Sequence, residues 1–290
     1  MSDGEHLSRS ARRLAAVLEP VAGQVYFAPE CHREYGRLGF APSPATLDSG
    51  VQLPDGAAYF TSRGSCLGQV PGELVAAAFA VFNPQVVIPA VRLGWTHCDA
   101  ATIASARTRG ATAQLVRILG ERPDGLDRAT SLLQRTAAPL RPEGRPLYAG
   151  LLSLDLPADP MGAMWRSADI LREFRGDAHT ASWTSAGFDA TEIGLLTELY
   201  RGVPARSQIR TRAWSDAQLD AAEDRLRSRG LLDGTGLTEK GRAARDAVEV
   251  ATDRQCGPAV EALGDQLTEL VDLLEPWGAA IRAAGGFPPS

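Results

Sequence analysis

The chain has 290 residues, a formal net charge of −5 and 44% apolar residues. This composition fits a soluble globular protein of one or two domains, and the acidic balance argues against the basic footprint of a DNA-reading protein. No apolar run reaches the roughly 18 residues of a membrane span, and the N-terminus lacks the apolar core of a signal peptide. We therefore expect a cytoplasmic protein with no membrane partner.

Helical spacing of apolar residues dominates the first part of the chain. A first helix is predicted from one apolar stripe, formed by Leu14, Val17, Leu18, Val21 and Val25. The Pro- and Gly-rich stretch 42–56 predicts a loop, and residues 58–61 fit either a short strand or the start of a helix. Another helical stripe over 74–82 should end at Asn83, because the residue before a proline disfavours the helical conformation.

Two further helices are predicted before a proline-rich segment. Asp99 is a candidate N-cap for a helix that continues to Leu119, and the next helix covers residues 125–138. Five prolines lie between residues 139 and 160, which is typical of a connection between domains. We therefore divide the chain into residues 1–150 and 151–290.

The second half contains clearer helix boundaries. An apolar stripe over 164–174 predicts a helix that ends near Gly176. Asp189 and Glu192 have the spacing of a capping box, and the helix that they open should be closed by Gly202. We therefore expect an interruption of helical structure between these two helices.

The stretch 213–241 predicts a helix followed by a short β-hairpin. Ser215 caps the helix, and its buried face is formed by Leu219, Ala222 and Leu226. Gly230 ends the helix, and residues 231–238 form a two-stranded hairpin around two glycines. Thr238 then caps the following helix.

The C-terminal helix is predicted to carry a coiled-coil-like seam. Its apolar residues follow alternating gaps of three and four: Val260, Leu263, Leu267, Leu270, Leu274, Trp277 and Ile281. Pro276 should kink the end of this helix. The partner of the seam could be another subunit or the helical N-terminal half, and we expect the N-terminal half.

These motifs carry a resemblance to a known family. The phrases RLRSRGLL (225–232) and LTEKG (237–241) resemble the MarR family of winged-helix regulators over about residues 189–284. The whole chain also resembles a less characterised bacterial group, through YFTSRGSCLG (59–68), FAVFNP (79–84), GRPLYAG (144–150), LREFRGDAHTASWTSAGFD (171–189) and ATDR (251–254). The resemblance implies a mainly α-helical fold. Two winged-helix halves with a small β-wing would form an intramolecular pseudo-dimer, and the N-terminal half would be degenerate.

The predicted recognition helix departs from this family in its charge. Its outward side carries carboxylates, with cations only near its end: Asp216, Asp220, Glu223 and Asp224, then Arg225, Arg227 and Arg229. Carboxylates repel the phosphates that supply most non-specific affinity. DNA is therefore a possible but disfavoured partner.

The segment 172–179 is the first candidate site, because it places charges and a histidine at the expected helix break. His179 is predicted to contact a ligand, or to act as a general base that Asp177 orients. Haem ligation by His179 is a further alternative, although no cofactor is predicted. The structural alternative is a buried salt-bridge network that contains Arg175 and Asp177.

The segment 59–68 is the second candidate, since Arg63 can bind a ligand carboxylate or phosphate in a two-pronged contact. The alternative is a plain turn.

Aromatic side chains are expected to line a pocket between the two halves, with the protein core as the alternative. The complete predicted ligand-binding set is His179, Arg63, Tyr59, Phe60, Phe79, Phe82, Asn83, Trp165 and Trp183. For Asn83, a backbone cap is the alternative.

Three functions remain open at this stage. The leading prediction is binding of a medium-sized, largely apolar small molecule, such as a natural product, for sensing, sequestration or self-protection. The first alternative is an enzyme of specialised metabolism that uses His179 and Asp177 for acid–base chemistry. The second is a ligand-responsive MarR-type transcriptional regulator.

The four cysteines lack metal-ligand spacing, so no metal site is predicted. The chain is expected to be a monomer or a homodimer.

Overall fold

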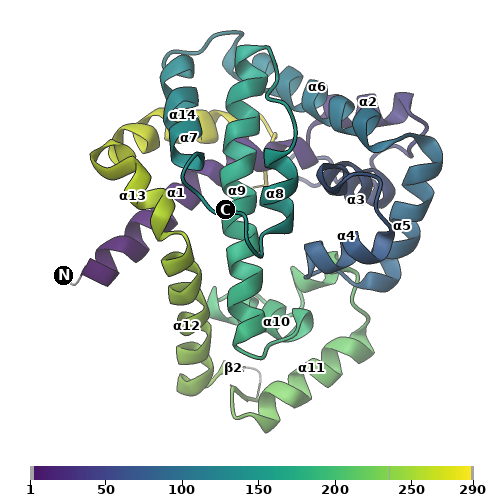
Figure 1. The fold of residues 1–290 in the computed structure, drawn as a ribbon. Coiled ribbons are helices and arrows are strands. Elements are labelled where there is room, and N and C mark those ends of the chain that lie inside the picture. Colours follow the sequence, from purple (N-terminus) through teal and green to yellow (C-terminus); the bar gives the residue numbers. More distant parts are fainter. Residues whose placement is uncertain (1–2, 235, 289–290) are drawn as a thin grey trace.

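The computed structural model describes residues 3–234 and 236–288, and helices account for most of them (Figure 1). The α-helices are α1 (Asp3–Gly23), α2 (Pro29–Arg37), α3 (Gly56–Gly64), α4 (Gly72–Phe79), α5 (Pro84–His97), α6 (Ala100–Leu119), α7 (Leu126–Ala137), α8 (Pro146–Leu152), α9 (Pro160–Ser185), α10 (Ala190–Tyr200), α11 (Asp216–Ser228), α12 (Glu239–Gln255), α13 (Gly257–Leu263) and α14 (Leu267–Ala283). Short 3-10 helices cover Gln24–Tyr26, Ser65–Leu67, Ile209–Arg212 and Gly264–Gln266. Strands β1 (Leu232–Asp233) and β2 (Gly236–Leu237) form an antiparallel hairpin in which Leu232 lies opposite Leu237.

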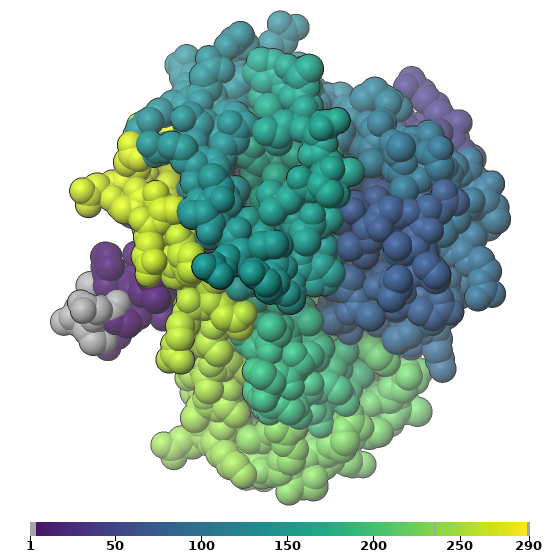
Figure 2. Space-filling model, viewed as in Figure 1, coloured from purple at the N-terminus to yellow at the C-terminus, as the bar shows by residue number. Residues whose placement is uncertain are grey.

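Two apolar cores divide the molecule into unequal parts. The larger core joins residues of α1–α9 with residues of α13 and α14, and we call this part the helical body. The smaller core lies under α10, α11, the hairpin and the first part of α12, and we call this part the distal module. Figure 2 shows the distal module as the light-green surface at one end of the molecule. The division at residue 150 into two related winged-helix halves stays a prediction.

Helix α9 runs through the centre of the structure and belongs to both cores (Figure 1). Trp165, near its start, is fully buried in the helical body, whereas Trp183, near its end, is buried in the distal module. Asp159 caps the helix by accepting a hydrogen bond from the Gly162 N–H group, and Pro160 occupies its first turn. The helix therefore connects the two cores without interruption.

The prediction that this helix ends near Gly176 is wrong. A glycine inside a helix costs only about 1 kcal/mol relative to alanine, and the burial of α9 on several faces outweighs that cost. A Cβ atom at Gly176 would lie 3.3 Å from Oε2 of Glu173, so the glycine leaves room for a buried carboxylate. The expected break in residues 172–179 is thus the middle of a helix.

The predicted helix caps are confirmed. Asp99 accepts from Thr102 N–H, and Thr238 accepts from Gly241 N–H. Asp189 forms the expected capping box with Glu192, and Ser215 forms another with Gln218. The ambiguous residues 58–61 are helical, because Asp55 caps α3 by accepting from Ala58 N–H.

Two of the connections differ from the prediction. The proline-rich segment 139–160 contains α8, whose Tyr148 is buried and donates its hydroxyl hydrogen bond to main-chain carbonyls of the α7 end. The apolar seam near the C-terminus is split, since Gly264 has a φ of +49° and a 3-10 turn separates α13 from α14. A left-handed glycine cannot continue an α-helix, so the seam is not one continuous helix.

Helix α14 packs against α1, which agrees with the expected packing against the N-terminal half. The two helices approach closely where Gly278 faces Pro20, because a Cβ atom on Gly278 would lie 2.8 Å from the proline ring. In the part of the chain that the structure describes, no helix combines the length and apolarity needed to cross a lipid bilayer.

Candidate functional site

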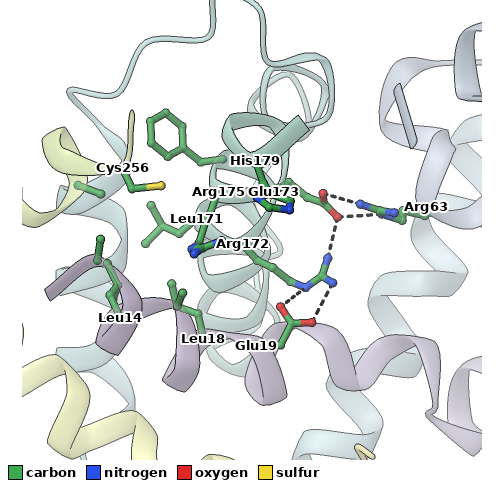
Figure 3. Close-up of a pocket in the computed structure, with 15 residues that line it drawn as sticks. Leu14, Leu18, Glu19, Arg63, Leu171, Arg172, Glu173, Arg175, His179 and Cys256 are labelled. Carbon is green, nitrogen blue, oxygen red and sulfur yellow. Dashed lines mark hydrogen bonds and ion pairs between the residues drawn. The ribbon is translucent and has the colours of Figure 1, made fainter. Parts of the chain in front are cut away.

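A pocket of about 190 Å³ lies between α1 and α9, and Cys256 and Ala259, where α12 meets α13, complete its lining. One wall is aliphatic, with Leu14 and Leu18 of α1, and the facing wall carries the charged side chains of α9 (Figure 3). The full lining is Ala11, Leu14, Ala15, Leu18, Glu19, Arg63, Leu171, Arg172, Glu173, Phe174, Arg175, Gly176, His179, Cys256 and Ala259. The pocket is therefore amphipathic.

Ion pairs centred on Glu173 form the charged wall. Arg63 donates to both carboxylate oxygens of Glu173 at 2.9 and 2.7 Å, and Arg172 donates to Oε1 at 3.0 Å. Arg172 also donates to both oxygens of Glu19 at 2.9 Å. Burial alone would raise the pKa of Glu173, but the two guanidinium groups outweigh it and lower the pKa to about 2. Glu173 is thus ionised, and its acceptor sites are occupied.

Arg63 lines this pocket, but its guanidinium is already engaged. It forms the two-pronged contact with Glu173 and lies 4.5 Å from the centroid of the Phe79 ring. A ligand carboxylate would have to displace Glu173 to bind Arg63 in the same way. Arg63 is therefore a structural partner of α9 in this state.

His179 also lines the pocket, and its hydrogen bonds define its tautomer. Its Nδ1 atom lies 3.1 Å from Oγ1 of Thr252, and the Thr252 hydroxyl donates to the Val248 carbonyl at 2.8 Å. Since that hydroxyl hydrogen is used, Thr252 accepts from Nδ1–H of His179. Burial lowers the pKa of His179 to about 4. The imidazole is therefore neutral near pH 7, with an unprotonated Nε2 that can accept a hydrogen bond.

Asp177 is not brought together with His179. Its Oδ2 atom accepts from the Tyr148 N–H group at 3.0 Å, on the α8 side of α9, whereas His179 faces α12. Residues two apart in a helix do not share a face. Burial raises the pKa of Asp177 to about 7. Among the contacts of the described residues, the orienting hydrogen bond of an Asp177–His179 acid–base pair is missing.

Arg175 belongs to an ion-pair network with α12. It lies 3.1 Å from Glu249 and 3.6 Å from Asp253, and Arg12 of α1 donates to the same Asp253 at 2.7 Å. The structural alternative therefore holds for Arg175 but not for Asp177. The Nε atom of Arg175 is buried without a hydrogen-bond partner in the described structure.

The predicted aromatic residues lie in the two cores, outside the described pocket lining. Tyr59, Phe60, Phe79 and Phe82 stack against one another with ring centroids 5.1–6.3 Å apart. Trp165 is fully buried and donates to the Ala22 carbonyl at 3.1 Å, and Trp183 is buried in the distal module. These positions agree with the core alternative.

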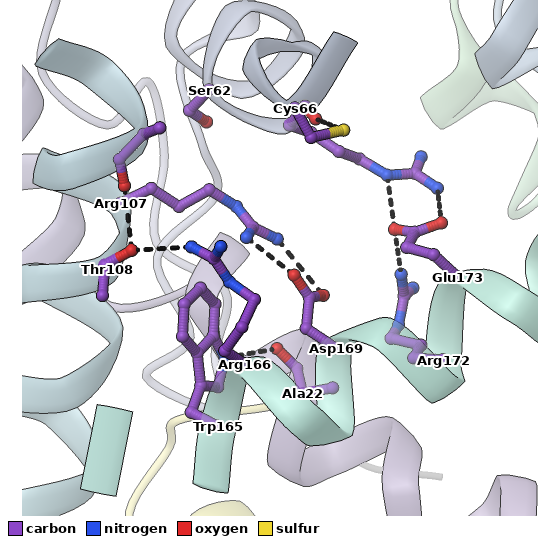
Figure 4. Close-up of polar contacts among 12 residues, drawn as sticks. Ala22, Ser62, Cys66, Arg107, Thr108, Trp165, Arg166, Asp169, Arg172 and Glu173 are labelled. Carbon is purple, nitrogen blue, oxygen red and sulfur yellow. Dashed lines mark hydrogen bonds and ion pairs between the residues drawn. The ribbon is translucent and has the colours of Figure 1, made fainter. Parts of the chain in front are cut away.

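A second buried ion pair lies further along α9 (Figure 4). Arg107 of α6 donates to both oxygens of Asp169, at 2.8 and 3.3 Å, and both side chains are at most 5% exposed. The sequence reasoning missed Asp169 and Glu19, and it included Glu173 in the candidate segment 172–179 without assigning it a role. Asp169 and Glu173 are four residues apart, so both carboxylates face the same side of one helix, and this spacing was the available signal.

The acidic face of α11 is covered by arginines of the preceding segment. Arg206 contacts Asp220 at 2.7 Å and Glu223 at 2.7 Å, and Arg210 contacts Asp216 at 2.7 Å. The carboxylates of Asp216 and Asp220 nevertheless remain 64% exposed. The face is therefore partly neutralised within the chain.

The turn before α5 joins the helical body to the N-terminal end of α11, and we call this contact the junction. Trp214 donates its indole N–H to the Val81 carbonyl at 2.9 Å. The Asn83 amide donates to the Ala213 carbonyl at 2.9 Å and to Gln218 at 3.3 Å. Asn83 also caps α5 by accepting from Gln85 N–H at 3.0 Å, as its alternative interpretation predicted.

One comparison with known proteins gives a match. A family model described as a helix-turn-helix family matches residues 11–288, which extend from α1 to beyond the end of α14. Neither the curated proteins nor the solved structures contain a match to this chain.

Proposed function

Because the chain belongs to the helix-turn-helix family, we propose that it is a ligand-responsive helix-turn-helix protein whose small-molecule site is the pocket between α1 and α9. The observation that carries this proposal is the pocket itself. It combines an aliphatic wall, a neutral histidine with a free acceptor atom, and a position on the helix that links both cores.

The size of the pocket points to a ligand smaller than the medium-sized molecule that the sequence suggested. Its volume of about 190 Å³ is below the range of about 300–1,000 Å³ that drug-sized ligands occupy. A dry cavity of about 150 Å³ is enough for benzene. A molecule with one ring is therefore the best fit.

The polar chemistry of the wall favours a neutral ligand with a hydrogen-bond donor. Glu173 is saturated by Arg63 and Arg172, so a cationic ligand finds its acceptor sites occupied. The unprotonated Nε2 of His179 can accept a hydrogen bond from a hydroxyl group. The aliphatic side chains of Leu14, Leu18 and Leu171 would contact the ring. A phenol-like compound matches these features.

Binding of three one-ring probes tests the proposal: phenol, toluene and benzylamine. We expect saturable one-to-one binding of phenol in calorimetry, weaker binding of toluene and none of benzylamine. His179→Ala should remove the advantage of phenol over toluene, because one hydrogen bond is worth about 1 kcal/mol, or about fivefold in Kd.

Cavity filling provides the second arm of this test. Ala259→Leu places a larger side chain in the buried lining and should abolish binding of all probes. Ala181→Leu, on the exposed side of α9, is the matched control. The proposal fails if no probe binds saturably, or if Ala259→Leu binds phenol as the wild type does. Native mass spectrometry of the purified protein would identify a ligand that co-purifies.

The second candidate, a transcriptional regulator, is favoured by the family match and by the arginines around α11. In such a protein the distal module would contact duplex DNA, with α11 as its reading helix. Fluorescence anisotropy with a labelled duplex tests this candidate. It predicts binding at low salt that weakens steeply as salt increases, and no binding at low salt would exclude it.

A further inference from the structure

A second cavity, of about 210 Å³, lies where the distal module meets the helical body. Its wall includes Val81 of the body, His179 of α9 and residues of α10 and of the segment before α11. It is distinct from the pocket between α1 and α9, although His179 lines both. The two cavities are therefore neighbours along α9.

Two arginines of this cavity form no ion pair among the described residues. Arg201 and Arg212 line it, and no ion pair or side-chain hydrogen bond of either guanidinium occurs among the contacts of the described residues. Several other arginines of the distal module are paired with carboxylates, as Arg206, Arg210 and Arg225 are. The cavity thus differs in charge from its surroundings.

Glu198 is the carboxylate of the cavity lining, and its hydrogen bonds go to main-chain groups. Glu198 is 1% exposed and accepts from the backbone N–H groups of Arg206, Gln208 and Ile209 at 2.5–2.6 Å. These bonds tie the segment before α11 to α10 and occupy both carboxylate oxygens. Two arginines and one carboxylate therefore line the cavity, and the two guanidinium groups leave an excess of positive charge there.

Arg212 is held in place by the helical body. Its guanidinium carbon lies 4.7 Å from the centroid of the Phe82 ring, and its carbonyl accepts from Asn83 N–H at 3.0 Å. Burial lowers the pKa of Arg212, which indicates that its charge is poorly compensated. A guanidinium that is fixed in this way is ready to bind an anion without further ordering.

The backbone on both sides of the junction is strained. Ala80 and Ala213 have φ values of +53° and +63°, although neither is a glycine. Val81 N–H donates to the Phe79 carbonyl at 2.5 Å and so closes a three-residue turn around Ala80. Such strain persists only where surrounding contacts hold it, and it is frequent at ligand clamps.

We propose that the second cavity is a binding site for a small oxyanion, a phosphate or a phosphate monoester, which bridges Arg201 of α10 and Arg212 of the junction. The bound anion supplies a counterion and holds the distal module against the helical body. Both arginines can donate two parallel N–H bonds to phosphate oxygens.

Titration of the full chain with inorganic phosphate tests this site, with binding followed by calorimetry and by the thermal midpoint. We expect saturable binding in the millimolar range. Arg212→Gln and Arg201→Gln should each weaken it at least tenfold, whereas Arg212→Lys should retain part of it. Arg141→Gln removes an exposed arginine far from the cavity and should change nothing.

Further variants and a competition experiment distinguish this cavity from the first pocket and from a DNA-contacting surface. Ala259→Leu should leave phosphate binding intact, because Ala259 lines the first pocket and not this cavity. Arg201 is exposed at the end of α10, so its substitution should fold even if the Arg212 variants do not. The proposal is overturned if phosphate does not saturate, or if Arg141→Gln weakens binding as much as Arg201→Gln. It is also overturned if duplex DNA displaces phosphate completely, since the arginines would then be contacts for the DNA backbone.

Discussion

The ion pairs along α9 and those along α11 use the same chemistry in opposite surroundings. In the helical body, the Arg107 and Asp169 side chains are 5% and 0% exposed. On the distal module, the Arg206 and Asp220 side chains are 22% and 64% exposed. Water screens the second pair and stabilises its separated charges, but it does neither for the first.

This difference assigns different roles to the two sets. Removing one partner of a buried pair leaves an uncompensated charge in the core, so the pairs of α9 fix the arrangement of the helices around it. Exposed pairs contribute little to stability and can be exchanged for other charges. The surface of α11 can therefore change partners while the helical body stays fixed. The following predictions test this contrast.

The largest effect is expected for Asp169→Ala, which leaves Arg107 buried without its carboxylate. We expect the free energy of unfolding to fall by about 3–5 kcal/mol, measured by urea denaturation. Asp127→Ala breaks the exposed Arg122–Asp127 pair and serves as control, with a change within about 0.5 kcal/mol. Equal losses in the two variants would remove the distinction between buried and exposed pairs.

The next largest effect is expected in the pH dependence of the free energy of unfolding. It depends on His179 of α9, which lies between the helical body and the distal module. Its pKa is lowered from 6.5 to about 4 in the folded protein. The stabilisation is therefore complete above pH 6.5 and is lost as the pH falls through 4, and it reaches at most about 3 kcal/mol. His179→Gln should flatten the unfolding free energy between pH 6.5 and 4, whereas His6→Gln, at an exposed position, should not. An unchanged slope in His179→Gln would contradict the buried neutral imidazole.

A smaller effect is expected for Trp214→Phe, which removes the indole hydrogen bond to Val81 at the junction. The loss should be about 1 kcal/mol. Trp95→Phe removes a similar bond to the Val70 carbonyl inside the helical body. Hydrogen exchange should accelerate at the start of α11 in Trp214→Phe and not in Trp95→Phe. If both variants alter α11 equally, the junction does not hold the distal module.

The smallest change in stability is expected for Asp220→Asn, within about 0.5 kcal/mol. The same substitution removes an exposed negative charge from α11 and frees Arg206 from one partner. Affinity for duplex DNA at low salt should therefore rise if the distal module contacts phosphates. Asp127→Asn, on the helical body, is the control. Equal DNA affinity in both variants would argue against α11 as a DNA-contacting face.

Local features of the structure could be predicted from the sequence because they depend on neighbouring residues. Asp99, Asp189, Ser215 and Thr238 cap their helices as expected, since an N-cap needs only a short polar side chain and the next three residues. The packing of α14 against the N-terminal half followed from an apolar stripe that had to be buried, although its partner α1 was not singled out.

The candidate site was less predictable because it depends on distant partners. Glu173 is 110 residues from Arg63, and Asp169 is 62 residues from Arg107, so no local pattern pairs them. The continuity of α9 through Gly176 could not be predicted from the sequence either. Burial of the helix on several faces overrides the weak tendency of glycine to interrupt a helix. Arg63 and His179 were found as lining residues, but their partners determine what they can do.

Helix α9 has one more consequence, which is mechanical. Arg172 lies beside the first pocket and Ser185 ends the helix near the distal module, which is a distance of about 20 Å at about 1.5 Å per residue. A tilt of about 5° at the pocket would move the far end by about 1.7 Å over that length. This is more than the slack of the Trp214–Val81 hydrogen bond, so a ligand that wedges α9 away from α1 would release the junction.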